Sequence, residues 1–179
     1  MKTRVQIAGI AAASLLIIFN AGEAKADLIG SSVDVTANFP SAMTIFADGG
    51  VKVVGSGVEY AVGSFAAYNP DFSIDLSGSQ IIISNATGTT FSTAGFNGFV
   101  ITDLSGAFQS VSANTALSNF LPVNLSVSGN EIFVNYSGLV TPGQAVSVID
   151  FTLARPSPAP QSAQAHRASL SLHSSSVGS

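Results

Sequence analysis

Between residues 27 and 153, apolar and polar side chains alternate with a period of two. In the segment VDVTANF (33–39), every second residue is apolar or small, which is the pattern of a β-strand with one buried face. No long stretch of this part repeats at helical spacing. The pattern predicts strands at residues 33–39, 43–46, 51–54, 72–77, 80–84, 96–101, 108–113, 121–127, 131–136 and 145–153.

Two tight turns predict how some of these strands pair. In the segment PVNLSVSGNEIFVNY, a two-residue loop of Gly129 and Asn130 closes a hairpin. All pairs on one face of this hairpin are then apolar. The expected pairs are Ser128 with Glu131, Val127 with Ile132, Leu125 with Val134 and Val123 with Tyr136.

A second hairpin is expected in the segment FSIDLSGSQIIIS. A loop of Gly78 and Ser79 pairs Leu76 with Ile81 and Ile74 with Ile83. A slip of one residue would bring serines and an aspartate to the buried face, so the burial pattern favours the same register independently.

Many short antiparallel strands, turn sequences such as DGG, GSG and TPGQ, and no long helical pattern predict an all-β chain. We expect a single antiparallel β-sandwich, immunoglobulin-like or jelly-roll-like, over residues 27–153. Most of the strands are shorter than the ~9 to 11 residues of strands that cross an outer membrane as a barrel, which is the lesser alternative.

The first 26 residues have the pattern of an export signal. Lys2 and Arg4 precede a charge-free apolar run at 5–19, which is shorter than the ~20 residues of a membrane-spanning helix. Ala24 and Ala26 provide the small side chains that signal peptidase reads. We therefore expect cleavage after Ala26 and a mature chain with no transmembrane anchor; the alternative is an uncleaved anchor.

The end of the chain, residues 154–179, is rich in serine and proline and has few large apolar side chains. Such a segment buries too little surface to offset the entropy of ordering, so we expect a disordered tail.

Charge and composition exclude several partners. The chain has no cysteine and no tryptophan, so disulfides, thiolate nucleophiles and cysteine-bound metals are absent. Residues 27–153 carry nine acidic side chains and one basic side chain, Lys52, and therefore a net charge of −8. A surface of this sign repels phosphates, so we expect neither nucleic acid nor anionic lipid as a partner.

Three segments resemble a group of secreted bacterial proteins that carry a C-terminal PEP-CTERM sorting signal: DLIGSSVDV, FNGFVITDLSG and NEIFVNYSGLVTPGQAVSVIDF. The resemblance spans residues 27–153. It implies export, a β-rich extracellular domain and an association with exopolysaccharide or biofilm-forming bacteria, but no known activity and no catalytic residues. The Val-Pro-Glu-Pro motif, apolar helix and basic cluster of that signal are absent here, where ARPSPAP and serines follow instead.

One segment begins like a calcium-binding loop. NPDFSID places oxygen-bearing side chains at alternate positions, namely Asn69, Asp71, Ser73 and Asp75. The glycine and the bidentate glutamate that such a loop needs at positions 6 and 12 are replaced by Ile74 and Gln80. A strand with Ser73 and Asp75 facing solvent explains the same residues, so we expect no cofactor and keep calcium as the lesser alternative.

No constellation predicts an enzyme. Both histidines, His166 and His173, lie in the tail, where no scaffold holds them near a serine, a carboxylate or a metal. Carboxylate pairs of the kind that glycosidases use can be drawn only from scattered residues, with no tryptophan to line a cleft. These residues are Asp48, Glu59, Asp71, Asp103 and Glu131.

Aromatic residues gather in the middle of the sequence: Phe65, Tyr68, Phe72, Phe91, Phe96 and Phe99. Phenylalanine at strand spacing is usually core. Sugar-stacking platforms favour tryptophan and tyrosine, so Tyr60 and Tyr68 are the candidate carbohydrate-binding residues, whereas Tyr136 is expected in the buried face of its hairpin.

The segment SQIIISN (79–85) has high β-propensity and no charge. Such a segment pairs edge to edge with another chain when it is exposed, but it is equally typical of a central strand. The central strand is the favoured interpretation.

Together these features predict a secreted or cell-surface, non-enzymatic structural or adhesive component of an extracellular matrix or biofilm. Its expected partners are a second copy or an extracellular polysaccharide. The alternative is a weak carbohydrate-binding module.

Overall fold

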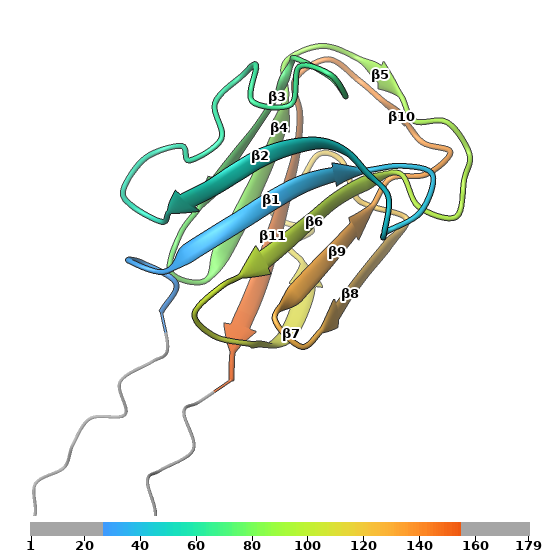
Figure 1. The fold of residues 1–179 in the computed structure, drawn as a ribbon. Coiled ribbons are helices and arrows are strands. Elements are labelled where there is room, and N and C mark those ends of the chain that lie inside the picture. Colours follow the sequence, from blue (N-terminus) through green and yellow to red (C-terminus); the bar gives the residue numbers. More distant parts are fainter. Residues whose placement is uncertain (1–26, 155–179) are drawn as a thin grey trace, which may run out of the picture.

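The computed structural model describes residues 27–154, so the expected export signal and all but the first residue of the expected tail lie outside the described residues. Eleven strands and no helix occur in this part (Figure 1), and nothing in it is a helix long and apolar enough to span a membrane. The strands are β1 (Ser32–Asn38), β2 (Ile45–Val53), β3 (Phe72–Leu76), β4 (Gln80–Asn85), β5 (Thr89–Thr90), β6 (Gly98–Asp103), β7 (Phe108–Ala113), β8 (Asn124–Ser128), β9 (Glu131–Asn135), β10 (Val140–Thr141) and β11 (Ala145–Leu153).

The strands form two main sheets, both antiparallel. One has five strands in the order β2-β1-β6-β9-β8, and the other has four in the order β3-β4-β11-β7. Figure 1 shows the two sheets as facing layers, with the short pair β5 and β10 at one end. This arrangement confirms the prediction of an all-β, sandwich-like body.

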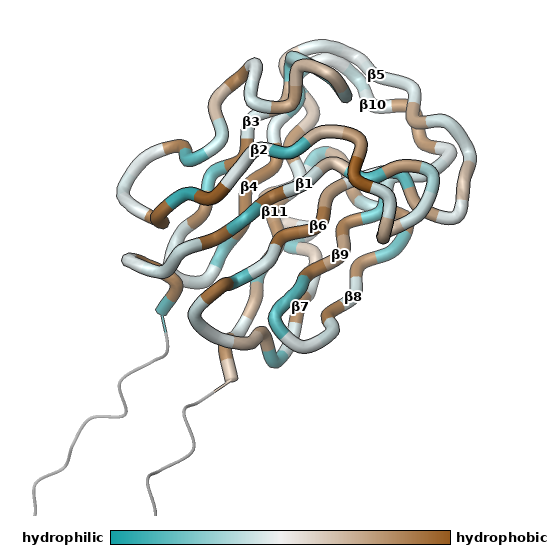
Figure 2. Tube along the Cα trace, viewed as in Figure 1, coloured by the Kyte–Doolittle hydropathy of each residue, from teal (hydrophilic) through white to brown (hydrophobic). Residues whose placement is uncertain are grey.

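The core lies between the two layers, and β3, β4 and β9 each contribute every second residue to it. The five-stranded sheet contributes Val35, Phe99, Ile101, Ile132 and Val134, and the four-stranded sheet contributes Ile74, Leu76, Ile81, Ile83 and Ile149. In Figure 2, hydrophobic positions run together along β6 and β9, where Phe99, Val100 and Ile101 and then Ile132, Phe133 and Val134 follow one another. Full burial of such a side chain contributes about 1.5–3 kcal/mol, so the alternating pattern provides the main driving force for this fold.

Five of the six phenylalanine and tyrosine residues in the central aromatic group belong to the buried interior. Phe65, Phe72, Phe91, Phe96 and Phe99 expose at most 6% of their surface. The core interpretation of the phenylalanines is confirmed.

Both predicted hairpins have the expected register near the turn. Val127 pairs with Ile132 and Leu125 with Val134, while Leu76 pairs with Ile81 and Ile74 with Ile83. Gly129 has a φ of 60°, which suits the first central position of a two-residue hairpin turn.

The outermost expected pair, Val123 with Tyr136, is not formed. β8 begins at Asn124, and Pro122 has no N–H with which the ladder could continue. Val123 is 52% exposed, whereas Tyr136 is 1% exposed. The amide of Val123 instead donates to the carbonyl oxygen of Asn135 over 2.8 Å, so the prediction was wrong at this position, where the regular ladder ends at Asn124.

β2 is one strand where the sequence predicted two. The DGG segment reads as a turn, but in the structure Gly49 and Gly50 together oppose the single residue Val35. This is a β-bulge, and the φ of 70° at Gly50 is the backbone conformation that glycine adopts without strain. The bulge lets β2 continue along β1 after the extra residue.

The segment 79–85 is a central strand, as favoured. β4 lies between β3 and β11, with its backbone paired on both sides. Because no free edge remains on β4, this segment cannot join a second chain edge to edge.

Candidate functional site

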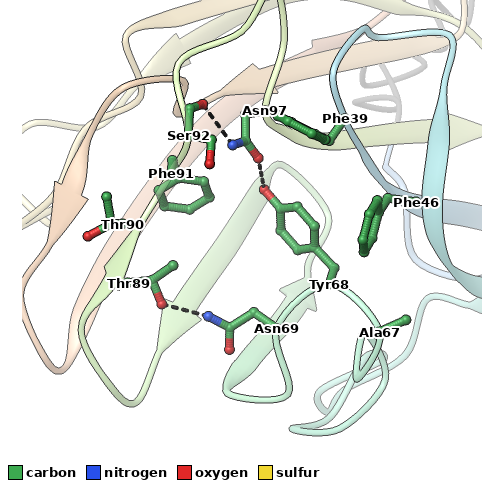
Figure 3. A pocket seen from close by; sticks show the side chains of 10 residues that line it. All are labelled: Phe39, Phe46, Ala67, Tyr68, Asn69, Thr89, Thr90, Phe91, Ser92 and Asn97. Atoms are coloured by element: carbon green, nitrogen blue, oxygen red, sulfur yellow. Dashed lines mark hydrogen bonds between the residues drawn. The ribbon is translucent and has the colours of Figure 1, made fainter.

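A pocket of about 230 Å³ opens near the end of the sandwich that carries β5 and β10 (Figure 3). Three separate parts of the chain form it: the β1–β2 connection with the start of β2, the loop before β3, and the segment from β5 to β6. The lining residues are Phe39, Phe46, Ala67, Tyr68, Asn69, Thr89, Thr90, Phe91, Ser92 and Asn97.

Aromatic rings form the apolar part of this pocket. The ring centroid of Tyr68 lies 6.1 Å from that of Phe46 and 6.4 Å from that of Phe91, and Figure 3 shows Tyr68 between these two side chains. Phe46 is 52% exposed, so one face of its ring is accessible from solvent. Phe46 lies near the start of β2, which is an edge strand of its sheet.

Asn97 and Tyr68 form the first polar contact of the pocket. The phenol of Tyr68 donates a hydrogen bond to Oδ1 of Asn97 over 2.5 Å, and Nδ2 of Asn97 donates to the carbonyl oxygen of Ser92 over 2.9 Å. Burial raises the pKa of Tyr68 above its ordinary value, and the neighbouring Tyr136 raises it further. The phenol therefore stays protonated and remains a donor at physiological pH.

Asn69 and Thr89 form the second polar contact. Nδ2 of Asn69 donates to Oγ1 of Thr89 over 2.6 Å, and Nδ2 of Asn85 donates to the same oxygen over 3.0 Å. Because Oγ1 of Thr89 accepts two bonds, its own proton is left to bind a further acceptor.

The backbone around these residues is held by local hydrogen bonds. The amide of Thr89 donates to Oγ1 of Thr141 over 2.8 Å across the β5–β10 pair. The amide of Asn69 donates to the carbonyl oxygen of Phe65 over 2.8 Å, and Phe65 is fully buried. The polar side chains of the pocket are thus positioned by the core on one side and by a short strand pair on the other.

None of the ten lining residues carries a charge. The pocket offers amide and hydroxyl groups next to aromatic rings. This chemistry suits binding of a neutral ligand with both apolar and hydrogen-bonding faces.

The two predicted carbohydrate-binding tyrosines have different environments. Tyr68 lines the pocket. Tyr60 is fully buried, and its phenol oxygen lies 2.9 Å from the carbonyl oxygens of both Val33 and Gly50. The prediction is corrected for Tyr60, because a ring that packs inside the core offers no face to a sugar.

The predicted calcium residues do not converge. Asn69 contacts Thr89, and Asp71 accepts a hydrogen bond from the hydroxyl of Thr87. Asp75 lies four residues beyond Asp71 along β3, which corresponds to roughly 13 Å of strand. Burial raises the pKa of the Asp75 carboxyl, and the nearby Glu59 raises it further. Between residues 27 and 154, no group of three histidine, cysteine, aspartate or glutamate side chains is placed to hold a metal.

Two of the scattered carboxylates accept hydrogen bonds from backbone amides. Glu59 accepts hydrogen bonds from the amides of Gly55 and Leu76 over 2.8 Å each. Asp103 accepts from the amide and the hydroxyl of Ser105 over 2.9 Å. These contacts fix loops beside the strands. The expected cleavage residues Ala24 and Ala26 and both histidines lie outside the described residues.

Sequence reasoning missed Phe46, Thr89 and Asn97 as pocket residues. Phe46 and Asn97 fall in segments that read as ordinary strands, and Thr89 belongs to a strand of two residues. No local motif joins these positions, because they meet only after the sheets fold.

Comparison of the chain with protein-family models, with curated proteins and with solved structures finds no match in any of the three. The geometry of the pocket therefore carries the functional argument.

Proposed function

We propose that the protein is a secreted or cell-surface, non-enzymatic adhesive component that binds extracellular polysaccharide through the pocket between Phe46 and Tyr68. The observation that carries the proposal is the half-exposed ring of Phe46 next to the amides of Asn69 and Asn97. A sugar ring has an apolar C–H face and a rim of hydroxyls, which match an aromatic face and a set of amide and hydroxyl groups.

The polar groups keep unused hydrogen-bonding capacity. Each of Asn69 and Asn97 uses one amide hydrogen on a protein acceptor, and a primary amide has two. The hydroxyl proton of Thr89 is also free of the two contacts that its oxygen accepts. Binding of this kind needs no proton transfer and no cofactor, and we propose neither an enzymatic role nor bound calcium.

The burial of Leu28, two residues after the expected cleavage position, supports keeping this residue in the mature chain. Leu28 is fully buried, and its amide donates to the carbonyl oxygen of Gly78 over 3.3 Å. Cleavage after Ala26 would therefore leave this buried residue in the mature chain. With the resemblance to PEP-CTERM proteins, this supports a mature immunoglobulin-like or jelly-roll-like domain in a matrix or biofilm.

A glycan array probed with the purified full chain tests the proposal. We expect binding to at least one extracellular polysaccharide, and we expect Phe46→Ala to reduce it. Met43→Ala is the matched control, because Met43 is 87% exposed but does not line the pocket. An array without a reproducible signal, or equal loss in both variants, contradicts the proposal.

Self-association is the second candidate function, and the edge strand β2 favours it. Besides Phe46, three of its apolar side chains face solvent, with Ile45 60%, Val51 56% and Val53 64% exposed. Apolar edge strands pair with other chains. Sedimentation velocity of the full chain over a hundredfold concentration range tests this role, and Val53→Lys should shift any assembly toward the monomer. A single monomeric species at all concentrations contradicts it.

A further inference from the structure

We infer that the ligand of the pocket is an uncharged sugar residue at a chain end, and that the site discriminates against uronic acids and other anionic sugars. This inference rests on the proposed function and specifies its ligand.

The first argument is the absence of a counter-ion. No lining residue is charged, and Lys52, on the exposed side of β2, is the single lysine or arginine between residues 27 and 154. Transfer of an ionised carboxylate into a partly enclosed site is unfavourable unless an opposite charge compensates it. The pocket contains none.

A charged residue close to the pocket in the sequence has the wrong sign for an anionic ligand. Asp71 lies two residues after the lining residue Asn69, and its backbone amide donates to Oδ1 of Asn69 over 2.9 Å. Its carboxylate accepts a hydrogen bond from the neutral hydroxyl of Thr87. Together with the net charge of −8 on the body, it repels uronates on approach and in the pocket.

The hydrogen-bonding groups of the pocket also favour a ligand with hydroxyl groups. The pocket presents donors on Asn69, Asn97 and Thr89 together with an acceptor oxygen on Tyr68. A sugar hydroxyl both donates and accepts, so it can match either kind of group. A carboxylate accepts only, and its oxygens would repel the oxygen of Tyr68 and the amide oxygens.

The size of the pocket indicates one ring. Its volume of about 230 Å³ lies below the ~300–1,000 Å³ of sites that enclose drug-sized ligands. Phe46 is half-exposed at its rim, so the remainder of a glycan can leave the pocket on this side. The geometry therefore points to the terminal residue of a chain or branch.

Titration calorimetry of the full chain with matched tetrasaccharides tests the inference. The probes are gluco-, galacto- and manno-tetrasaccharides, each paired with the same backbone carrying a carboxylate at C6 of its terminal non-reducing residue. We expect the best neutral probe to bind at least tenfold more tightly than its uronate partner at both 0.15 M and 0.5 M NaCl. The higher salt shortens the screening length from about 8 Å to roughly 4 Å, which removes most of the long-range repulsion by the body.

Two variants of Phe46, with Met43→Ala as a control, test whether the neutral probe binds in the pocket. We expect Phe46→Ala to weaken binding of the neutral probe at least fivefold and Phe46→Tyr, which keeps the ring, to change it less than twofold. Met43→Ala should also stay within twofold. Circular dichroism of each variant confirms that the fold is intact.

The outcomes separate the inference from the proposed function. Uronate binding that equals or exceeds neutral binding, and that Phe46→Ala abolishes, overturns the inference and leaves the function standing. Discrimination that disappears at 0.5 M NaCl also overturns it, because the body charge and not the pocket is then responsible. Binding of neither class overturns both.

Discussion

The phenol oxygen of Tyr68 donates a hydrogen bond to Oδ1 of Asn97 over 2.5 Å. This contact joins the loop before β3 to the segment that leads into β6, which are 29 residues apart in sequence. The amide of Asn97 in turn donates to the carbonyl oxygen of Ser92. One side-chain pair thereby holds two walls of the pocket at a fixed separation.

Tyr68→Phe removes this hydrogen bond and keeps the ring. We expect a loss of about 0.5–1.5 kcal/mol in the free energy of unfolding, which is typical for one intramolecular hydrogen bond. Affinity for a neutral oligosaccharide should fall roughly threefold to tenfold, because Asn97 loses its fixed orientation. Urea denaturation and calorimetry measure the two effects. Unchanged values in both experiments would show that the pair does not organise the pocket.

Two other tyrosines provide a matched comparison in the core. The phenol of Tyr60 contacts the carbonyl oxygens of Val33 and Gly50, whereas the buried hydroxyl of Tyr136 lies beside Ser147 but makes no well-formed hydrogen bond within the described residues. Tyr60→Phe should therefore lower the free energy of unfolding by about 1–3 kcal/mol. Tyr136→Phe should leave it unchanged or raise it, since it removes an unsatisfied polar group. Urea denaturation of both variants tests this order, and the reverse order contradicts it.

Gly49→Ala tests the packing of the β2 bulge. An added Cβ would lie 2.7 Å from Cδ1 of Tyr60 and 2.9 Å from Cε1 of Phe65, and both rings are fully buried. We expect a loss of about 1–3 kcal/mol, which is typical of overpacking in a core. Gly55→Ala is the control, because a Cβ there meets nothing within 4 Å. Equal stability of the two variants in urea would mean that the rings move aside at no cost.

Asp34 makes the stability of the fold depend on pH. Burial raises the pKa of its carboxyl above the ordinary value, and the carboxylate of Asp48 raises it further. The folded chain therefore holds this proton at pH values where the unfolded chain, with an ordinary aspartate pKa of about 3.9, has released it. Its contribution to stability grows as the pH falls through the raised pKa and levels off below about 3.9.

Asp34→Asn removes the unfavourable charge, and one carboxylate oxygen of Asp34 is buried without a hydrogen-bond partner among residues 27–154. We expect the variant to be more stable than the parent at pH 7 and this advantage to shrink toward pH 4. Urea denaturation at a series of pH values between 4 and 7 measures the difference. An advantage that grows on acidification would contradict the argument.

The strands and the two hairpins could be predicted because they depend on residues that are close together in the sequence. Alternation in β3 and β4 places Ile74 opposite Ile83 once the two-residue turn is assigned. A slip of one residue would exchange the buried and exposed faces, so the pattern admits only one register. The same reasoning failed at Val123, because the regular ladder ends at Asn124.

The bulge in β2 could be recognised only in the folded structure, which also decided that β4 is a central strand, the interpretation that its sequence favoured. The DGG segment has the composition of a turn, and only pairing with β1 distinguishes a turn from a bulge. The sequence of β4 is uncharged and strand-forming, which is compatible with an edge strand or a central strand of a sheet. Pairing with both β3 and β11 makes β4 a central strand.

The sequence by itself determined the alternation of buried and exposed residues along strands such as β3, β4 and β9, the two hairpin turns and the acidity of the body. Periodicity, turn chemistry and charge are properties of residues close together in the sequence. Only the tertiary structure decided that Tyr60 is enclosed while Tyr68 meets Phe46, Thr89 and Asn97 at a pocket. The physical reason is that strand alternation specifies the face of a side chain but not its partners, which depend on the order in which strands from distant parts of the chain pair and pack.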